Sequence, residues 1–175
     1  MKFSELELKG AYLIEPELIN DNRGFFARSF CIDEFQANNL EFEIKQSNLS
    51  FNKDKGTLRG MHFQQEPFAE AKLVKCISGS IYDIIVDLRK ESQTYKQWLG
   101  MELSSINRKM LYIPKGFAHG FQTLEDNVEV FYQMFEKYAP GFSSGVKWND
   151  VSLSIKWPIP ISVISEKDKS YPDMD

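Results

Sequence analysis

Short β-type segments separated by turn residues run along most of this chain and leave little room for helices. Turns such as Ser78-Gly79 and Pro114-Lys115-Gly116 carry the residues that tolerate tight or left-handed backbone. Only residues 32–39 and 150–154 have the pattern of short helices. Strands are predicted over residues 8–14, 24–30, 57–64, 72–77, 80–88, 98–103, 109–113, 117–124 and 128–135.

Closely spaced antiparallel strands favour an all-β fold, a jelly-roll barrel or a related barrel, over a parallel α/β fold. A chain of 175 residues is expected to form one domain over residues 1–175, and 14 phenylalanines supply its core. Residues 157–175 differ, because they hold three prolines and a run of charges. We predict that this tail wraps the barrel as ordered coil; the alternative is a frayed terminus.

Charge and cysteine content indicate which partners and which compartment to expect. A net charge of −4 gives no basic face for a phosphate backbone, which argues against nucleic acid. Cys31 and Cys76 lack C-x-x-C spacing and the N-terminus carries no apolar signal segment, so a reduced, cytoplasmic protein is expected. The apolar runs are of strand length, which argues against membrane attachment.

The chain has only two histidines, His62 and His119, each in a glycine-marked β segment. Alternation along residues 57–64 puts His62 on the face of Gly60 and Gln64, and the same rule lets Tyr132 point inward from its own strand. An imidazole and a phenol that face each other across a barrel are a plausible general base and general acid. The alternative for each is a core residue with a satisfied hydrogen bond.

Four cationic side chains could assist such a pair. Lys72 and His62 are expected on adjacent strands of a hairpin. Lys72 could stabilise the oxygen of an enolate, or it could be a surface lysine paired with Glu70. Arg23, Arg59 and Lys167 could hold phosphates, although a solvated surface role fits each arginine taken alone. Strict alternation places Arg59 opposite His62, so a shared site requires a bulge at Gly60 or a neighbouring subunit.

Metal chemistry has little support in the sequence. Gln64 stands two residues after His62, where a His-x-His pair would need histidine, and two imidazoles are too few for such a cluster. We therefore expect neither a metal site nor a cofactor. Nucleophile elbows, P-loops and Gly-x-Gly-x-x-Gly fingerprints are also missing.

Six segments in order resemble the dTDP-4-dehydrorhamnose 3,5-epimerase family over nearly the whole chain. The segments are Asp21-Asn22-Arg23-Gly24-Phe25-Phe26, Gln46-Ser47-Asn48, Gly56-Thr57-Leu58-Arg59-Gly60-Met61-His62-Phe63-Gln64, Lys72-Leu73-Val74, Ile113-Pro114-Lys115-Gly116-Phe117-Ala118-His119-Gly120-Phe121 and Ser165-Glu166-Lys167-Asp168. The resemblance implies a metal-free, cupin-type jelly roll. It also implies a homodimer that exchanges N-terminal strands and acts without a cofactor on a nucleotide-linked 4-keto-6-deoxy sugar.

The resemblance also assigns catalytic roles. His62 resembles the base that removes a proton α to the C4 ketone, and Asp168 the carboxylate that orients its imidazole. Tyr132 resembles the acid that returns a proton from the opposite face, and Lys72 the donor to the enolate oxygen. Because C3 and C5 both lie α to the ketone, one such set can serve both carbons.

Binding roles follow by the same resemblance. The diphosphate or its surroundings are assigned to Arg23, Arg59 and Lys167, the nucleotide sugar to Gln46, Ser47 and Asn48, stacking on the base to Tyr138, and a sugar contact to His119. Arg28 and Ser143 stand where family members that use thymidine substrates often carry glutamate. These two departures bear on which nucleotide and sugar are used.

Other functions remain open at this point. One is a C3-only or C5-only epimerase acting on a dTDP-, CDP- or GDP-linked 4-keto sugar. Another is a sugar-nucleotide-binding cupin that has lost its chemistry, which the joint presence of His62, Lys72, Tyr132 and Asp168 argues against. A metal-dependent cupin, such as a dioxygenase or sugar isomerase, is disfavoured by Gln64 and the histidine count.

Overall fold

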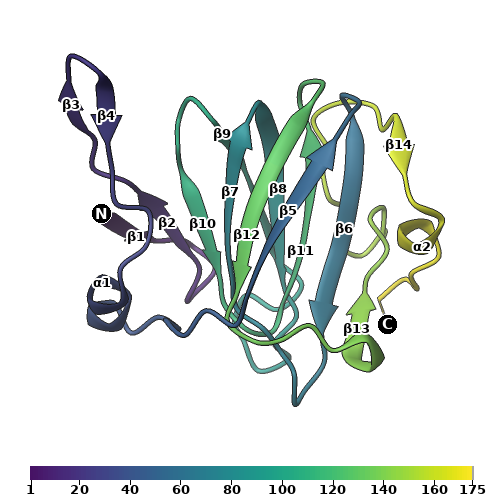
Figure 1. Ribbon diagram of the computed structural model, residues 1–175. Helices are drawn as coiled ribbons and strands as arrows, with labels where there is room; N and C mark the ends of the chain where they lie inside the picture. Colours follow the sequence, from purple (N-terminus) through teal and green to yellow (C-terminus); the bar gives the residue numbers. More distant parts are fainter. Residues whose placement is uncertain (175) are drawn as a thin grey trace.

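The computed structural model describes residues 1–174, and its regular structure is mostly antiparallel strands (Figure 1). The strands are β1 Lys2–Glu5, β2 Tyr12–Glu15, β3 Ile19–Asp21, β4 Gly24–Phe26, β5 Gln46–Asn52, β6 Thr57–Gln64, β7 Lys72–Ser78, β8 Ser80–Asp87, β9 Trp98–Ser104, β10 Met110–Ile113, β11 Phe117–Thr123, β12 Val128–Met134, β13 Ser143–Gly145 and β14 Val163–Ile164. The helices are α1 Ile32–Ala37, the single 3₁₀ turn η1 Pro140–Phe142, and α2 Glu166–Lys169.

Two sheets form the barrel. One has the strand order β1-β2-β10-β7-β12-β5, and the other has the order β13-β6-β11-β8-β9 with β14 added beside β6. The all-β, cupin-type jelly-roll prediction is confirmed by this architecture and by the solved structures described below. That residues 1–175 form a single domain stays a prediction.

Apolar side chains fill the space between the sheets. Val74, Ile85, Leu111 and Val130 are fully buried there, each on a different strand. A second cluster around Phe35 joins α1 to the barrel. Helix α1 ends where Asn39 adopts a left-handed φ of 56°, a conformation that asparagine tolerates.

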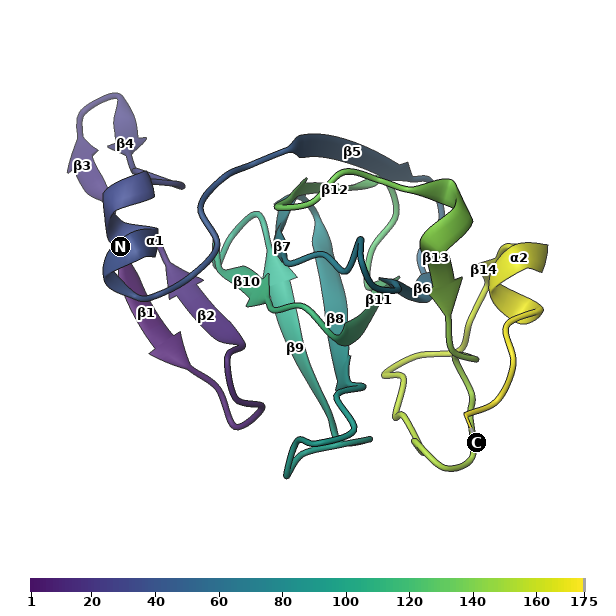
Figure 2. The same cartoon turned by 90° about the horizontal axis from the view of Figure 1, so that it is seen from below.

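The two ends of the chain lie on opposite sides of the barrel (Figures 1 and 2). The hairpin β3-β4 projects from the N-terminal side, and all of its strand residues are exposed. At the other side the C-terminal segment packs on the second sheet through Leu153 and Trp157. The prediction that this tail wraps the barrel agrees with these contacts, but coil was wrong for β14 and α2.

Several predicted boundaries were also wrong. Residues 150–154 form hydrogen-bonded turns instead of a helix, because Asp150 accepts from the backbone N–H groups of Ser152 and Leu153. Strands β1, β3, β5 and β13 were missed. The strand predicted over residues 24–30 ends at Phe26, and the one predicted over 8–14 begins only at Tyr12.

A β-bulge interrupts the pairing of β6 with β11. His119 is the cross-strand partner of His62, whereas Phe121 is the partner of Arg59, so three steps along β6 oppose two along β11. Gly60 lies inside this interval with a φ of +142°, and Gly120 is packed directly against it. A bulge at Gly60, which a shared site for Arg59 and His62 requires, is therefore present.

Replacing Gly60 with alanine should lower the free energy of unfolding by about 2 kcal/mol or more. A residue with a side chain is strained at this φ, and moving β6 away from β11 to make room would weaken the pairing of the two strands. The added Cβ would lie 2.5 Å from the Cα of Gly120. Urea unfolding measures the loss. Gly141→Ala is the matched control, since a Cβ there meets nothing within 4 Å, and it should change stability by less than about 0.5 kcal/mol. Equal losses in both variants would contradict this account.

Candidate active site

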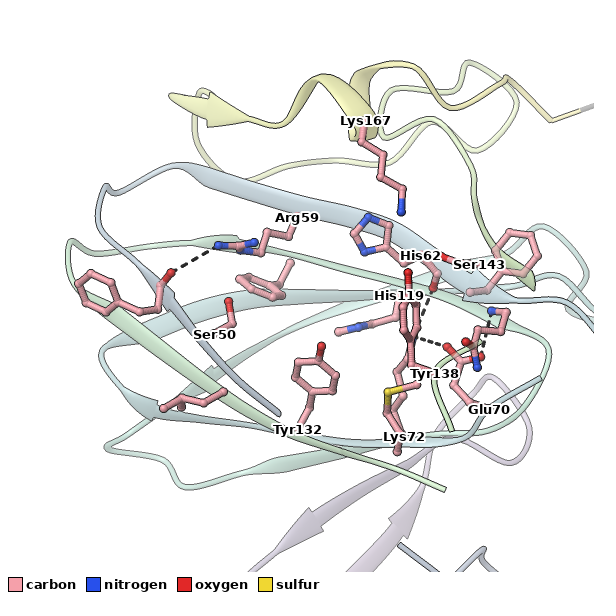
Figure 3. A pocket seen from close by; sticks show the side chains of 16 residues that line it. Ser50, Arg59, His62, Glu70, Lys72, His119, Tyr132, Tyr138, Ser143 and Lys167 are labelled. Carbon is pink, nitrogen blue, oxygen red and sulfur yellow. Dashed lines mark hydrogen bonds and ion pairs between the residues drawn. The ribbon is translucent and has the colours of Figure 1, made fainter. Parts of the chain in front are cut away.

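A cavity of about 480 Å³ opens between the two sheets (Figure 3). This volume is in the range of small-molecule sites. Strands β5, β6, β7, β11 and β12 supply most of its wall, and α2 and the segment around β13 close one side. The predicted site residues that line it are Arg59, His62, Lys72, His119, Tyr132, Tyr138 and Lys167.

His62 is held by a carboxylate that lies 106 residues further along the chain. Its Nε2 is 2.8 Å from Oδ1 of Asp168, and the other carboxylate oxygen accepts from the backbone N–H of Gly60 at 3.1 Å. Because an ionised carboxylate only accepts, Nε2 of a neutral His62 carries the proton and Nδ1 keeps the lone pair. This arrangement leaves Nδ1 free to act as a base.

Burial and hydrogen bonding act in opposite directions on Asp168. The carboxyl side chain is 6% exposed, and this burial raises its pKa. The hydrogen bond and charge of His62, together with donors from Gly60 and Ser165, outweigh burial and leave the pKa below its ordinary value. Ser165 also caps α2, since its Oγ accepts from the Asp168 N–H at 3.1 Å. The cap and the ion pair therefore hold one residue in place.

His119 forms a second histidine–aspartate pair, which the sequence reasoning missed. Its Nε2 lies 2.7 Å from Oδ1 of the fully buried Asp83 on β8. The signal was available, because Asp83 precedes the apolar run Ile84-Ile85-Val86 within a predicted strand and a buried carboxylate requires a partner. His119 is thus fixed at the cavity wall beside its cross-strand neighbour His62.

Lys72 is a buried lysine, so the surface alternative was wrong, although the predicted partner Glu70 is present. Its Nζ lies 2.7 Å from one oxygen of Glu70, whose other oxygen accepts from the backbone N–H of Gln64. Gln64 also holds the loop ahead of β7 through Phe68 and the segment after β12 through Lys137 and Ala139. An ammonium has three donors; Glu70 occupies one, and the backbone carbonyl of His62 accepts from another at 3.5 Å.

Tyr132 points its hydroxyl into the cavity from β12 (Figure 3). Burial raises the pKa of this phenol above its ordinary value, and the charges of Glu70 and Tyr138 add to the rise while Arg59 opposes it. The phenol therefore keeps its proton well beyond neutral pH and can donate it.

Strand β5 presents polar side chains to the inside of the barrel. Gln46, Asn48, Ser50 and Asn52 lie on this face, where Gln46 Nε2 donates to Asn48 Oδ1 at 2.8 Å. Ser47 is exposed on the opposite face, so alternation places it outside the predicted nucleotide-sugar contacts. Ser50, which the sequence reasoning missed, lines the cavity. Within residues 1–174, its buried Oγ and Nδ2 of Asn48 have no hydrogen-bond partner.

The predicted phosphate anchors are only partly brought together. Arg59 and Lys167 line the cavity, one from β6 and one from α2. Arg23 lies in the projecting hairpin, 90% exposed and paired with Asp21, and is not among the lining residues. Arg28 likewise lies outside, where it pairs with Glu34 at 2.9 Å, whereas Ser143 lines the cavity from β13.

Tyr171 is a further residue that sequence reasoning did not single out. Its ring meets the ring of His62 edge to face, with centroids 5.8 Å apart, and it packs so closely on Gly145 that a Cβ there would lie 2.6 Å from the ring. The segment after α2 thus packs against the imidazole of His62.

Two further features bear on the class of protein. Over residues 1–174, no group of three or more histidine, cysteine, aspartate or glutamate side chains could hold a metal ion. None of the helices in that range is long and apolar enough to cross a membrane.

A jelly-roll barrel that surrounds a carboxylate-held imidazole, a protonated phenol and a buried ammonium has the groups of a proton-transfer enzyme. Residues 5–175 match the family model described as dTDP-4-dehydrorhamnose 3,5-epimerase. The chain belongs to this family and is an isomerase of the carbohydrate epimerase class.

Individual relatives agree with the family match. The dTDP-4-dehydrorhamnose 3,5-epimerase of Methanothermobacter thermautotrophicus is 44% identical over 173 residues, covering 97% of this chain and 92% of that protein. The Bacillus anthracis 3,5-epimerase, solved with TDP and PPi bound, superposes with a TM-score of 0.96 at 43% identity and 99% coverage of both chains. The Legionella pneumophila enzyme, in complex with dTDP-4-keto-L-rhamnose, has a TM-score of 0.92 at 32% identity, covering 98% of this chain and 92% of that one.

Asp168→Asn should have a lower free energy of unfolding than the native protein near neutral pH, and this difference should disappear as the pH is lowered. The native carboxyl has a depressed pKa, so the stabilisation it contributes is complete above the unfolded-state pKa of about 3.9 and is lost as the pH falls through the folded-state value. We expect a deficit of about 1 kcal/mol at pH 6 that shrinks below about pH 4. Urea unfolding from pH 6 to pH 3 measures it, and a deficit that stays constant would contradict the ion pair.

Proposed function

We propose that the protein epimerises dTDP-4-dehydro-6-deoxy-D-glucose at C3 and C5. The observation that carries this proposal is the pair formed by His62 and Asp168, of which His62 lines the same cavity as Tyr132 and Lys72. The names of the curated relatives and the ligands of the solved neighbours support this substrate.

The chemistry follows from the acidity of carbons next to a ketone. Nδ1 of His62 removes the proton from C3 or C5, and the electrons move into an enolate at C4. Lys72 donates to the developing oxyanion with the N–H that Glu70 and the backbone carbonyl of His62 leave free. Tyr132 delivers a proton to the opposite face of the same carbon, because burial keeps its phenol protonated. After His62 has released its proton to water and Tyr132 has taken one up, repetition at the second carbon gives the doubly inverted product.

The remaining polar groups of the cavity are assigned to the nucleotide. Arg59 and Lys167 hold the diphosphate, since guanidinium and ammonium groups suit phosphate oxygens. Gln46 and Asn48 contact the nucleotide sugar. Tyr138 stacks on the base, and it is kept near the cavity by the bond from its N–H to Gln46 Oε1 at 3.2 Å. His119 contacts the hexose.

The same proposal includes the setting of the enzyme. It acts in the cytoplasm, in line with two unpaired cysteines, as one domain over residues 1–175. It needs no cofactor, because the substrate ketone itself acidifies both carbons.

A homodimer that exchanges N-terminal strands is part of the proposal. The hairpin β3-β4 exposes apolar side chains, with Ile19 67% and Phe26 70% exposed, and β5 exposes Leu49 at 61% beside the cavity. Apolar surfaces of this kind are typical of interfaces. Docking the hairpin of one subunit on β5 of the other would bring Arg23 to the diphosphate of the partner's site.

Proton NMR in D₂O tests the activity directly. With dTDP-4-dehydro-6-deoxy-D-glucose as substrate, we expect deuterium at both C3 and C5, followed by the signals of the inverted sugar. His62→Asn should slow exchange at both carbons by about 10² to 10⁴, the range that a general base contributes. Exchange at one carbon alone would make the protein a single-site epimerase.

A second variant separates the two halves of the reaction. Tyr132→Phe should retain exchange with retained configuration, because His62 can return deuterium to the face from which it took a proton, while inversion is slowed. Complete absence of exchange in the folded native protein, with CDP- and GDP-linked 4-keto sugars also inert, would favour a binding-only cupin.

Mixed subunits test the shared site. Arg23→Ala and His62→Asn proteins should each be impaired, since one lacks a phosphate anchor and the other the base. After denaturation and joint refolding, half of the dimers are mixed and hold one intact site, so about a quarter of native activity should return at substrate concentrations below KM. No recovery beyond the sum of the separate proteins would refute the exchange of hairpins.

A further inference from the structure

We propose that Asn52 is a positioning residue that fixes the guanidinium of Arg59 for the diphosphate of the substrate. This inference rests on the proposed function, because it presumes a nucleoside diphosphate ligand. Asn52 is the last residue of β5 and is only 2% exposed. Its Oδ1 accepts from Nε of Arg59 at 2.6 Å.

The orientation of the Asn52 amide is set by its other contacts. Nδ2 donates to the backbone carbonyl of Val128 at 3.2 Å and to that of Ser50 at 3.4 Å. Both of these partners can only accept, so the amide nitrogen faces them and the amide oxygen faces Arg59. Val128 is also the cross-strand partner of Asn52, which ties the amide to the β5-β12 ladder.

This contact restricts an arginine that is otherwise exposed. The amide oxygen of Asn52 accepts from Nε of Arg59, and the backbone carbonyl of Phe51 accepts from Nη2 at 3.4 Å. Two acceptors of β5 therefore hold one edge of the guanidinium. The Nη1 side of the fork remains for a ligand in the cavity that Arg59 lines. The positive charge of Arg59 is also close enough to Tyr132 to oppose the rise in the pKa of that phenol.

A side chain fixed before binding loses less entropy when it meets its ligand. The diphosphate is remote from the carbons that react, so this advantage concerns binding more than the proton transfers. Asn52→Ala should therefore raise KM for the dTDP sugar and Kd for dTDP about tenfold, a typical effect of losing a hydrogen bond to a charged group, while kcat changes much less. Affinity for thymidine, which lacks phosphate, should stay the same.

A double-mutant cycle distinguishes positioning from a general loss of structure. Calorimetric titration with dTDP and with inorganic pyrophosphate is made on the native protein, Asn52→Ala, Arg59→Ala and the double variant. If Asn52 acts through Arg59, Asn52→Ala weakens pyrophosphate binding about tenfold in the native background and less than twofold when Arg59 is already alanine. Equal weakening in both backgrounds, or a change of less than twofold in both, would overturn the inference.

Two further controls keep the test decisive. Asn52→Leu fills the same space without an acceptor, so it replaces the alanine variant if that protein does not fold. Asn107→Ala removes another asparagine that bonds to backbone groups, at the turn after β9, and should leave both affinities unchanged. Because pyrophosphate carries no base, a native protein that binds it but not dTDP would refute the proposed nucleotide alone. A native protein that binds neither would overturn both proposals.

Discussion

The close approach of Gly60 to Gly120 is the constraint on which the candidate site depends. Without a side chain at either position, β6 can take one extra residue against β11, and Arg59 then reaches the same cavity as His62. The same bulge frees the N–H of Gly60 from regular pairing, and that N–H binds Asp168. A single irregularity in one strand therefore sets the direction of Arg59, of His62 and of the carboxylate that holds His62.

Buried charge is tolerated in this barrel because each group has a partner. His62 pairs with Asp168, His119 with Asp83 and Lys72 with Glu70, while the apolar cluster fills the rest of the space between the sheets. Burying such ions costs free energy that their pairing only partly offsets, so pairs of this kind are weak contributors to stability. Their concentration around one cavity is better explained by the reaction, which needs a base, an acid and a cation outside bulk water.

The sequence predicts most strands of the barrel because they are short runs of β-type residues bounded by turns, and several of them are buried along their whole length. Strand β5 was missed for a physical reason: its polar residues lie on the more buried face and its apolar residues Leu49 and Phe51 are exposed, so the usual pattern is inverted. Alternation placed His62 correctly but put Arg59 on the wrong face, since a period of two has no place for a bulge. Resemblance, and no local pattern, identified Asp168, because α2 has only four residues and all four are charged. Asp83 was overlooked although a charge in a buried strand is a signal.

Asp168 is far from His62 along the chain, so the contact between them depends on the packing of the C-terminal segment against the barrel. Asp168 reaches His62 only because β14 adds beside β6 in parallel and α2 follows it directly, with Tyr171 backing the imidazole. Lys167, on the same short helix, lines the cavity. A local detachment of this segment would therefore remove Asp168 from His62 and Lys167 from the cavity in one step, and would leave the apolar core between the sheets in place. Such a segment can open at less cost than global unfolding, since its stability depends on few contacts. Activity should therefore be lost before the barrel unfolds.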